Sequence, residues 1–113
     1  MNKKEEFIEL RELCRKNYEY EQYDSGDITV KGNVNPYSEV YTGLEDADCI
    51  DVNYMENRKK RKVKDISNFT FKDCCTELTF LLRGERFSPG TFFNALKDKT
   101  VYKLLARAVE IMP

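Results

Sequence analysis

Residues 70–84 read Thr-Phe-Lys-Asp-Cys-Cys-Thr-Glu-Leu-Thr-Phe-Leu-Leu-Arg-Gly, and this stretch decides the fold class. Its apolar residues recur at helical spacing, which predicts a helix with one buried face. Thr70 suits the N-cap, Asp73 suits the first turn, and Gly84 predicts the end of the helix. The recurring positions are Phe71, Cys74, Cys75, Leu78, Leu81 and Leu82.

Two further helices are expected after this one. Ser88 and Pro89 form an N-cap followed by proline at the first helical position, which predicts a short helix through Phe92, Phe93 and Leu96. Thr100 predicts the cap of a third helix, with apolar residues from Val101 to Val109 on one side. Three helices joined by short links predict a compact C-terminal helical unit.

The N-terminal half gives weaker signals. Residues 2–19 predict a helix capped by Asn2, and a short helix is expected near Val52 with Tyr54 and Met55 facing inward. Residues 27–31 alternate polar and apolar, which predicts a strand, and residues 34–41 could pair back with it although Pro36 argues for an edge or a loop. We therefore expect a mainly α fold, a single domain over residues 1–113, with a possible small N-terminal β-hairpin.

Charge is divided unevenly along the chain. Residues 1–57 carry 6 Lys and Arg against 14 Asp and Glu, whereas residues 58–113 carry 13 against 6. The near-neutral total of −1 thus hides an acidic half and a basic half. This division predicts a charged partner, docking of the two halves on each other, or both.

The composition argues against most enzyme chemistry. The chain has no histidine, which excludes catalysis by Ser-His-Asp and Cys-His groups and leaves a carboxylate or lysine enzyme as the weakest hypothesis.

The four cysteines of the chain, which lack a Cys-x-x-Cys spacing, are expected to be free and buried in a reducing compartment. We expect no metal and no cofactor. The acidic start and the lack of a long apolar run predict a cytoplasmic protein without a signal peptide or membrane segment. The cysteines are Cys14, Cys49, Cys74 and Cys75.

Two charged segments are candidate binding surfaces. The first hypothesis is a non-catalytic protein-interaction module that uses acidic and tyrosine residues, because tyrosines are favoured at interfaces. Its candidates are Tyr18, Tyr20, Tyr23, Asp24, Glu45, Asp46 and Asp48. The alternative is nucleic-acid binding through the basic run 58–64, because Lys and Arg neutralise phosphates. Its candidates are Arg58, Lys59, Lys60, Arg61, Lys62 and Lys64.

Each surface also has a structural interpretation. The tyrosines could cover a small core, and the basic run could be a solvated helix end paired with the acidic segment 45–56. A third and weaker candidate is the corner at residues 83–90, where Arg83, Arg86 and the helix start at Ser88 could bind an anion. In the structural interpretation of that corner, Phe87 fills the core and Glu85 pairs an arginine or caps a helix.

The same corner carries a resemblance. Residues 79–90 and 95–105 resemble a family of small uncharacterised bacterial and phage proteins with the signature Arg-Gly-(Asp/Glu)-Arg-Phe-x-x-Gly, and residues 51–55 are similar to a segment upstream of it. Ser88 and Pro89 stand where a cysteine and an acidic or polar residue are expected, and Lys99 stands where glycine is usual. The resemblance implies a helical fold and a bacterial or mobile-element origin, without an assigned activity.

Overall fold

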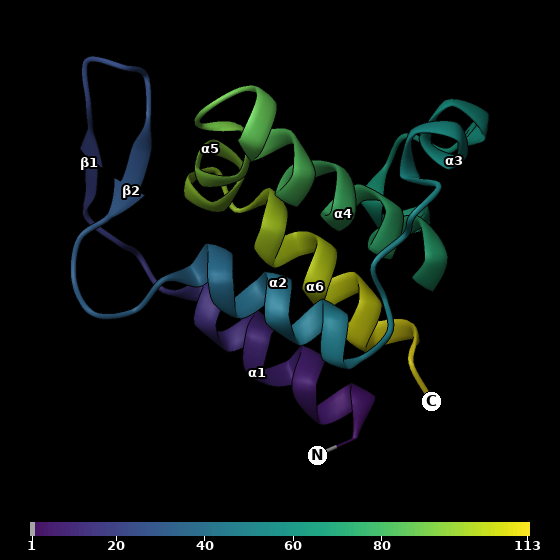
Figure 1. Ribbon diagram of the computed structural model, residues 1–113. Coiled ribbons are helices and arrows are strands. Elements are labelled where there is room, and N and C mark those ends of the chain that lie inside the picture. The colour runs from purple at the N-terminus through teal and green to yellow at the C-terminus, as the bar shows by residue number, and fades with distance from the viewer. Residues whose placement is uncertain (1) are drawn as a thin grey trace.

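The helix predicted from residues 70–84 forms the centre of the fold. In the computed structural model, which describes residues 2–113, it is α4 (Phe71–Phe87). Thr70 caps it as predicted, because the Thr70 hydroxyl accepts from the Asp73 N–H while the Asp73 carboxylate accepts from the Thr70 N–H. α4 packs against α5 (Thr91–Lys97) and α6 (Thr100–Ile111), which confirms the C-terminal helices (Figure 1).

The N-terminal helix completes the main body. α1 (Lys3–Arg15) packs against α6 on one side and against α2 (Pro36–Asp46) on the other (Figure 1). It ends at Arg15, four residues earlier than predicted, where the Lys99 ammonium donates hydrogen bonds of 2.9 and 3.0 Å to the Arg15 and Lys16 carbonyls. Lys99 has φ +73°, in the left-handed region that favours glycine.

The hairpin is present, but the strand at residues 28–30 pairs with residues 20–22 and not with residues 34–41 as predicted. β1 (Tyr20–Gln22) pairs antiparallel with β2 (Ile28–Val30), with Tyr20 opposite Val30. Residues 34–41, expected to supply the second strand, instead form the start of α2. The Asn35 side chain accepts from the N–H groups of Tyr37 and Ser38, so Asn35 is an N-cap and Pro36 follows it at the first helical position.

The corner after α4 also differs from expectation. Gly84 lies inside α4, where an added Cβ would come within 3.0 Å of Thr91 Cγ2, and the left-handed residue is Gly90 with φ +95°. α4 therefore runs one turn longer than predicted and α5 begins after Gly90, not after Ser88. The extra turn leaves Phe87 82% exposed, so the expectation that Phe87 fills the core is wrong.

A short arm links α2 to α4. It contains α3 (Tyr54–Lys60) and the 3₁₀ turn η1 (Ile66–Asn68), and α3 lies beside α4 (Figure 1). α3 buries none of its residues fully, and Met55 is exposed although the sequence suggested that it faces inward. The position of this arm depends on contacts of α3 with α4 and of η1 with α6, and not on a core of its own.

The core is one cluster of apolar side chains from α1, α2, α4, α5 and α6. Phe7, Leu78, Phe92 and Leu104 are all fully buried in it. Each such side chain stabilises the fold by roughly 1.5–3 kcal/mol relative to an exposed one. The four cysteines are free and buried, as predicted. Within residues 2–113, no helix has both the length and the apolar character needed to cross a bilayer.

Candidate functional site

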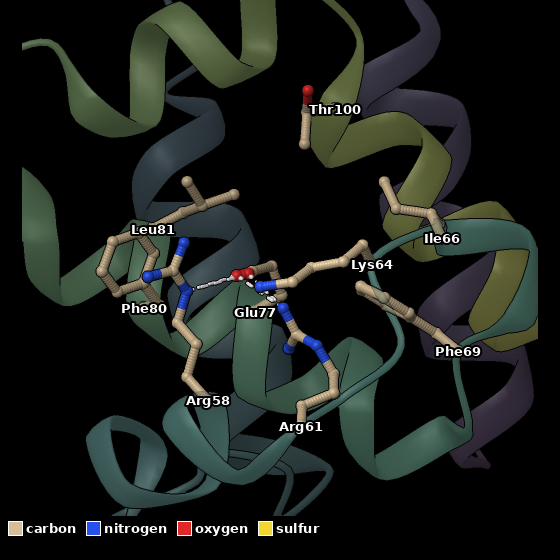
Figure 2. A pocket seen from close by; sticks show the side chains of 9 residues that line it. All are labelled: Arg58, Arg61, Lys64, Ile66, Phe69, Glu77, Phe80, Leu81 and Thr100. Carbon is tan, nitrogen blue, oxygen red and sulfur yellow. Dashed lines mark hydrogen bonds and ion pairs between the residues drawn. The ribbon is translucent and has the colours of Figure 1, made fainter.

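The arm that carries α3 lies over α4 and encloses a hollow of about 400 Å³ (Figure 2). Arg58, Arg61 and Lys64 point into this hollow from the arm, and Glu77 points into it from α4. Apolar side chains make up most of the remaining wall. They are Ile66, Phe69, Phe80 and Leu81, with Thr100 at the edge.

Asp51 fixes the start of the arm on α4. Its carboxylate accepts from the Thr76 hydroxyl at 2.6 Å and from the Asn57 amide at 2.9 Å, and its N–H donates to the Thr79 hydroxyl at 3.0 Å. Burial by itself would raise the pKa of Asp51, but the hydrogen bonds from Asn57, Thr76 and the Asn53 N–H, together with Lys72, hold that pKa below its usual value. The charged form of Asp51 therefore joins the beginning of the arm to the middle of α4.

Glu77 is the single carboxylate at the centre of the hollow. It is 8% exposed, and it accepts from Arg58 Nε at 2.6 Å and from Arg61 Nη2 at 3.3 Å. Figure 2 shows both guanidinium groups turned toward it. Two cations share one anion here, so the positive charge of the arginines is held in place without being cancelled.

Aromatic rings hold the same two guanidinium groups from the other side. The Arg58 guanidinium carbon lies 3.7 Å from the centre of the Phe80 ring, and that of Arg61 lies 4.4 Å from the centre of the Phe69 ring. Arg61 Nε also donates to the Val63 carbonyl at 3.1 Å. Arg61 Nη1 is buried and has no hydrogen-bond partner among the described residues. The arginines are thus ordered before any ligand arrives, which lowers the entropy cost of binding one.

The surrounding lysines extend the positive charge beyond the hollow. Lys59, Lys60, Lys62 and Lys64 are exposed, and none forms an ion pair within residues 2–113. A neighbouring hollow of about 310 Å³ lies between Met55, Lys59, Lys64 and Phe80. We call the six cations Arg58, Lys59, Lys60, Arg61, Lys62 and Lys64 the basic face. Over the described chain, no ion pair joins the basic face to the acidic segment 45–56.

The predicted tyrosine and acidic residues are not brought together into one surface. The Tyr18 hydroxyl donates to the Leu13 carbonyl at 2.7 Å, and the rings of Tyr18 and Tyr20 pack against the core. Burial raises the pKa of both phenols. Tyr23 and Asp24 are exposed in the hairpin, and Tyr23 donates to Glu21 at 2.9 Å.

The acids after the hairpin lie elsewhere. Glu45 and Asp46 end α2 and Asp48 follows in the next loop, all exposed. The hairpin is joined to the start of α2, so these acids lie at the far end of that helix (Figure 1). Nowhere in residues 2–113 do three or more possible metal-ligating side chains gather.

In the corner at residues 83–90, the carboxylate of Glu85 occupies the expected anion site. The Glu85 carboxylate accepts from the N–H groups of Gly90 at 2.7 Å and Phe92 at 2.9 Å. These are the free N–H groups that were expected to receive an external anion, so Glu85 caps the neighbouring helix as in the structural interpretation. Ser88 and Arg86 are exposed, and Arg83 lies 6.0 Å from the Tyr54 ring centre with its Nε buried and unpartnered in the described chain.

Sequence reasoning found the cations of the hollow and missed the residues that order them. Glu77 falls in the apolar stripe of α4, three residues after Cys74 and four before Leu81. A carboxylate in a buried stripe predicts a buried cation partner, and this signal was available. The contacts of Phe69 and Phe80 with arginines depend on how the arm folds back, for which the sequence gives no pattern.

Comparison with known proteins places nearly the whole chain in one family. A family described as "Family of unknown function (DUF6508)" matches residues 14–113. This range includes the basic face, the hollow and the corner at residues 83–90. Neither the curated proteins nor the solved structures gave a match.

Proposed function

We propose that this chain, which belongs to the DUF6508 family of unknown function, binds nucleic acid through its basic face and has no catalytic role. One observation carries the proposal: Arg58 and Arg61 are held over aromatic rings and share Glu77, while four lysines beside them have no ion pair in the described chain. Such a group of fixed and mobile cations suits the closely spaced charges of a phosphate backbone.

Contacts with phosphate fit the site better than base recognition does. The two aromatic rings of the hollow are covered by guanidinium groups, so they are not free to stack on bases. α3 has seven residues and buries none of them fully, which gives little rigid surface to insert into a major groove. We therefore expect binding that depends strongly on salt and weakly on sequence.

A mobility-shift titration tests the proposal. The wild-type chain is mixed with a short DNA duplex and, separately, with single-stranded RNA, over about 50–200 mM salt. We expect affinity to fall steeply as salt rises. Replacing Lys59, Lys60 and Lys62 by alanine should weaken binding at least tenfold and reduce the salt slope by about one for each phosphate that is no longer neutralised.

A matched variant controls for net charge. Lys16, Lys31 and Lys103 are exposed lysines outside the basic face, and replacing all three by alanine changes the net charge by the same amount. That variant should bind within about twofold of wild type, apart from the general effect of charge. Equal weakening by both triple variants, or no shift at the lowest salt, would reject the proposal.

A protein partner is a second candidate function, favoured by the exposed hairpin. Residues 21–25 are all exposed, and Tyr23 among them is 52% exposed. The test is capture of a partner by the wild-type chain, by a Tyr23→Ala and Asp24→Lys variant, and by the Lys59, Lys60 and Lys62 triple variant. Loss with the hairpin variant alone would favour this candidate, and loss with neither would remove both surfaces.

The setting is part of the proposal. A bacterial or phage origin follows from the resemblance at residues 83–90, and four free cysteines suit the cytoplasm, where thiols stay reduced. A non-catalytic role fits a chain without histidine. The genes adjacent to this one would test the origin, since phage or defence genes would support it and a metabolic operon would oppose it.

A further inference from the structure

A second hollow, of about 250 Å³, lies where the loop between α2 and α3 meets the start of α4. Two cysteines that are far apart in the sequence, Cys49 and Cys75, both line it. Lys3 and Lys72 line the same hollow. Although Cys49 and Cys75 are each only 6% exposed, this hollow gives a small reagent a route to them.

The two thiols line the same hollow and lie near enough to influence each other's protonation. As a neutral thiol, Cys49 donates a hydrogen bond of 3.3 Å to the Ala47 carbonyl, and as a thiolate it can accept one from Cys75. Cys75 stands on the rigid α4 helix, whereas Cys49 stands in a loop directly after Asp48, whose φ of +56° is unusual for a residue other than glycine. The N–H groups of Asp48 and Cys49 donate to the Glu45 and Leu44 carbonyls at 3.0 and 2.8 Å, which joins this loop to the end of α2. Cys49 itself lies outside the helices, so a rotation of its side chain toward Cys75 breaks no helical hydrogen bond.

The surroundings give the two sulfurs different acidities. The hydrogen bond from Cys75 lowers the pKa of Cys49 to about 7, against the effect of burial and of Asp48, and Lys3 lowers it further. The same hydrogen bond and burial raise the pKa of Cys75. Burial raises the pKa of Cys14 and of Cys74 to about 12. Of the four thiols, Cys49 therefore loses its proton most readily, and its neighbour Cys75 keeps its own.

We propose that Cys49 and Cys75 form a peroxide-reactive dithiol, in which Cys49 is the attacking thiolate and Cys75 is the resolving thiol. The assignment rests on the hollow that both cysteines line, on the two lysines in its wall and on the proximity of the two thiols. It is independent of the proposed binding function. The ligand class is a small hydroperoxide, which fits the hollow and brings the required oxidising equivalents.

The chemistry balances in two steps. The Cys49 thiolate attacks one oxygen of the hydroperoxide, the O–O bond breaks, and the hydroxide or alkoxide that leaves takes up a proton, so Cys49 becomes a sulfenic acid. The Cys75 sulfur then attacks the Cys49 sulfur, the S–O bond breaks, and water leaves with the proton of Cys75. Two thiols and one hydroperoxide give one disulfide, one water and one further water or alcohol. A dithiol reductant reverses the change by exchange.

Mass spectrometry of the full chain treated with hydrogen peroxide tests the proposal. In the wild type we expect a disulfide between Cys49 and Cys75, seen as the loss of two hydrogen atoms, with Cys14 and Cys74 still available for alkylation after denaturation. Cys75→Ser should stop at a sulfenic acid on Cys49, which dimedone traps. Cys49→Ser should not react at the same peroxide concentration, and Cys74→Ser should behave like the wild type.

If circular dichroism shows that a variant does not fold, thiol labelling of the wild-type protein still tests the proposal. Iodoacetamide should label Cys49 with half-maximal rate near pH 7, and at pH 7 at least about tenfold faster than Cys14 or Cys74. Oxidation or labelling of Cys14 or Cys74 as fast as that of Cys49 would overturn the proposal. So would disulfides only between separate chains.

Discussion

The basic face and the β-hairpin both combine charged residues with aromatic rings, yet the two regions use their rings in opposite ways. On the basic face, Phe69 and Phe80 lie against guanidinium groups and hold them in place. In the hairpin region, the rings of Tyr18 and Tyr20 pack against the core, and the Tyr20 ring centre lies 5.8 Å from the Lys97 ammonium, so neither ring orders the acidic side chains beside it.

This difference shows what turns a charged segment into a candidate site. A charge run in the sequence is usually a solvated surface, and the hairpin acids remain one. The basic face differs because a carboxylate from another helix and two rings from other segments fix its arginines. Substitutions in the two regions test this difference, and the largest effect is expected at Glu77.

Replacing Glu77 by alanine should have the largest effect on stability. The change leaves Arg61, whose side chain is only 12% exposed, without its carboxylate, and it also removes the partner of the more exposed Arg58. The free energy of unfolding should fall by about 3 kcal/mol. Urea denaturation measures the loss. Glu110→Ala is the control, because its ion pair with Arg107 is exposed and should contribute less than about 0.5 kcal/mol. Equal losses would mean that Glu77 does not organise the basic face.

Tyr18→Ala should come next, because this tyrosine packs on the core. Losing a half-buried ring and the 2.7 Å hydrogen bond to the Leu13 carbonyl should lower the free energy of unfolding by about 2 kcal/mol. Tyr18→Phe isolates the hydroxyl and should cost about 1 kcal/mol. If Tyr18→Ala left stability unchanged but abolished capture of a protein partner, Tyr18 would belong to an interface. The claim that the hairpin-region tyrosines serve the core would then be wrong.

Asp51→Asn should weaken the attachment of the basic arm to α4 in a pH-dependent way. At pH 7 the variant should lose about 1–2 kcal/mol of unfolding free energy, because an amide accepts less well from Thr76 and Asn57. The pKa of Asp51 is lowered on folding, so the stability it adds is present above its ordinary value of 3.8 and is lost as pH falls through the lower folded value. Urea titrations at pH 7 and at about pH 2 should show the gap between variant and wild type closing.

Phe80→Leu should affect binding more than stability. Leucine keeps the apolar contact but removes the ring 3.7 Å from the Arg58 guanidinium, so DNA affinity should fall about three- to fivefold. A mobility shift at low salt measures the change. Phe87→Leu is the matched control, because Phe87 is an exposed ring outside the basic face. Equal affinity for both variants would show that the stacking of Arg58 does not contribute.

Tyr23→Ala should have the smallest effect. This side chain is exposed at the hairpin, and its hydroxyl bonds only Glu21 within the described chain, so neither the urea midpoint nor DNA affinity should change measurably. A clear drop in the urea midpoint would mean that the hairpin supports the fold, contrary to its exposed position. A loss confined to the capture of a protein partner would instead support the second candidate function.

The helices were predicted best where the local pattern is complete. α4 combines a capping box with a repeated apolar stripe, and both signals lie within a few residues of each other. The pattern does not predict the first strand of the hairpin, because residues 20–22 give almost no alternation. Residues 34–41 were expected to pair as a strand or form a loop, whereas Asn35 and Pro36 start a helix. Gly84 suggested a helix end, but its close approach to Thr91 shows that packing, and not termination, explains this glycine.

The helical class, the C-terminal helices, the buried free cysteines and the division of charge could all be predicted from the sequence, because periodicity, capping residues and composition act over short distances along the chain. Which charges form a candidate site depends instead on contacts made in the folded chain. Glu77 meets Arg58 and Arg61, and Cys49 comes near Cys75, across separations of 16 to 26 residues. Such contacts depend on how the arm folds back on α4, and no local pattern encodes that path.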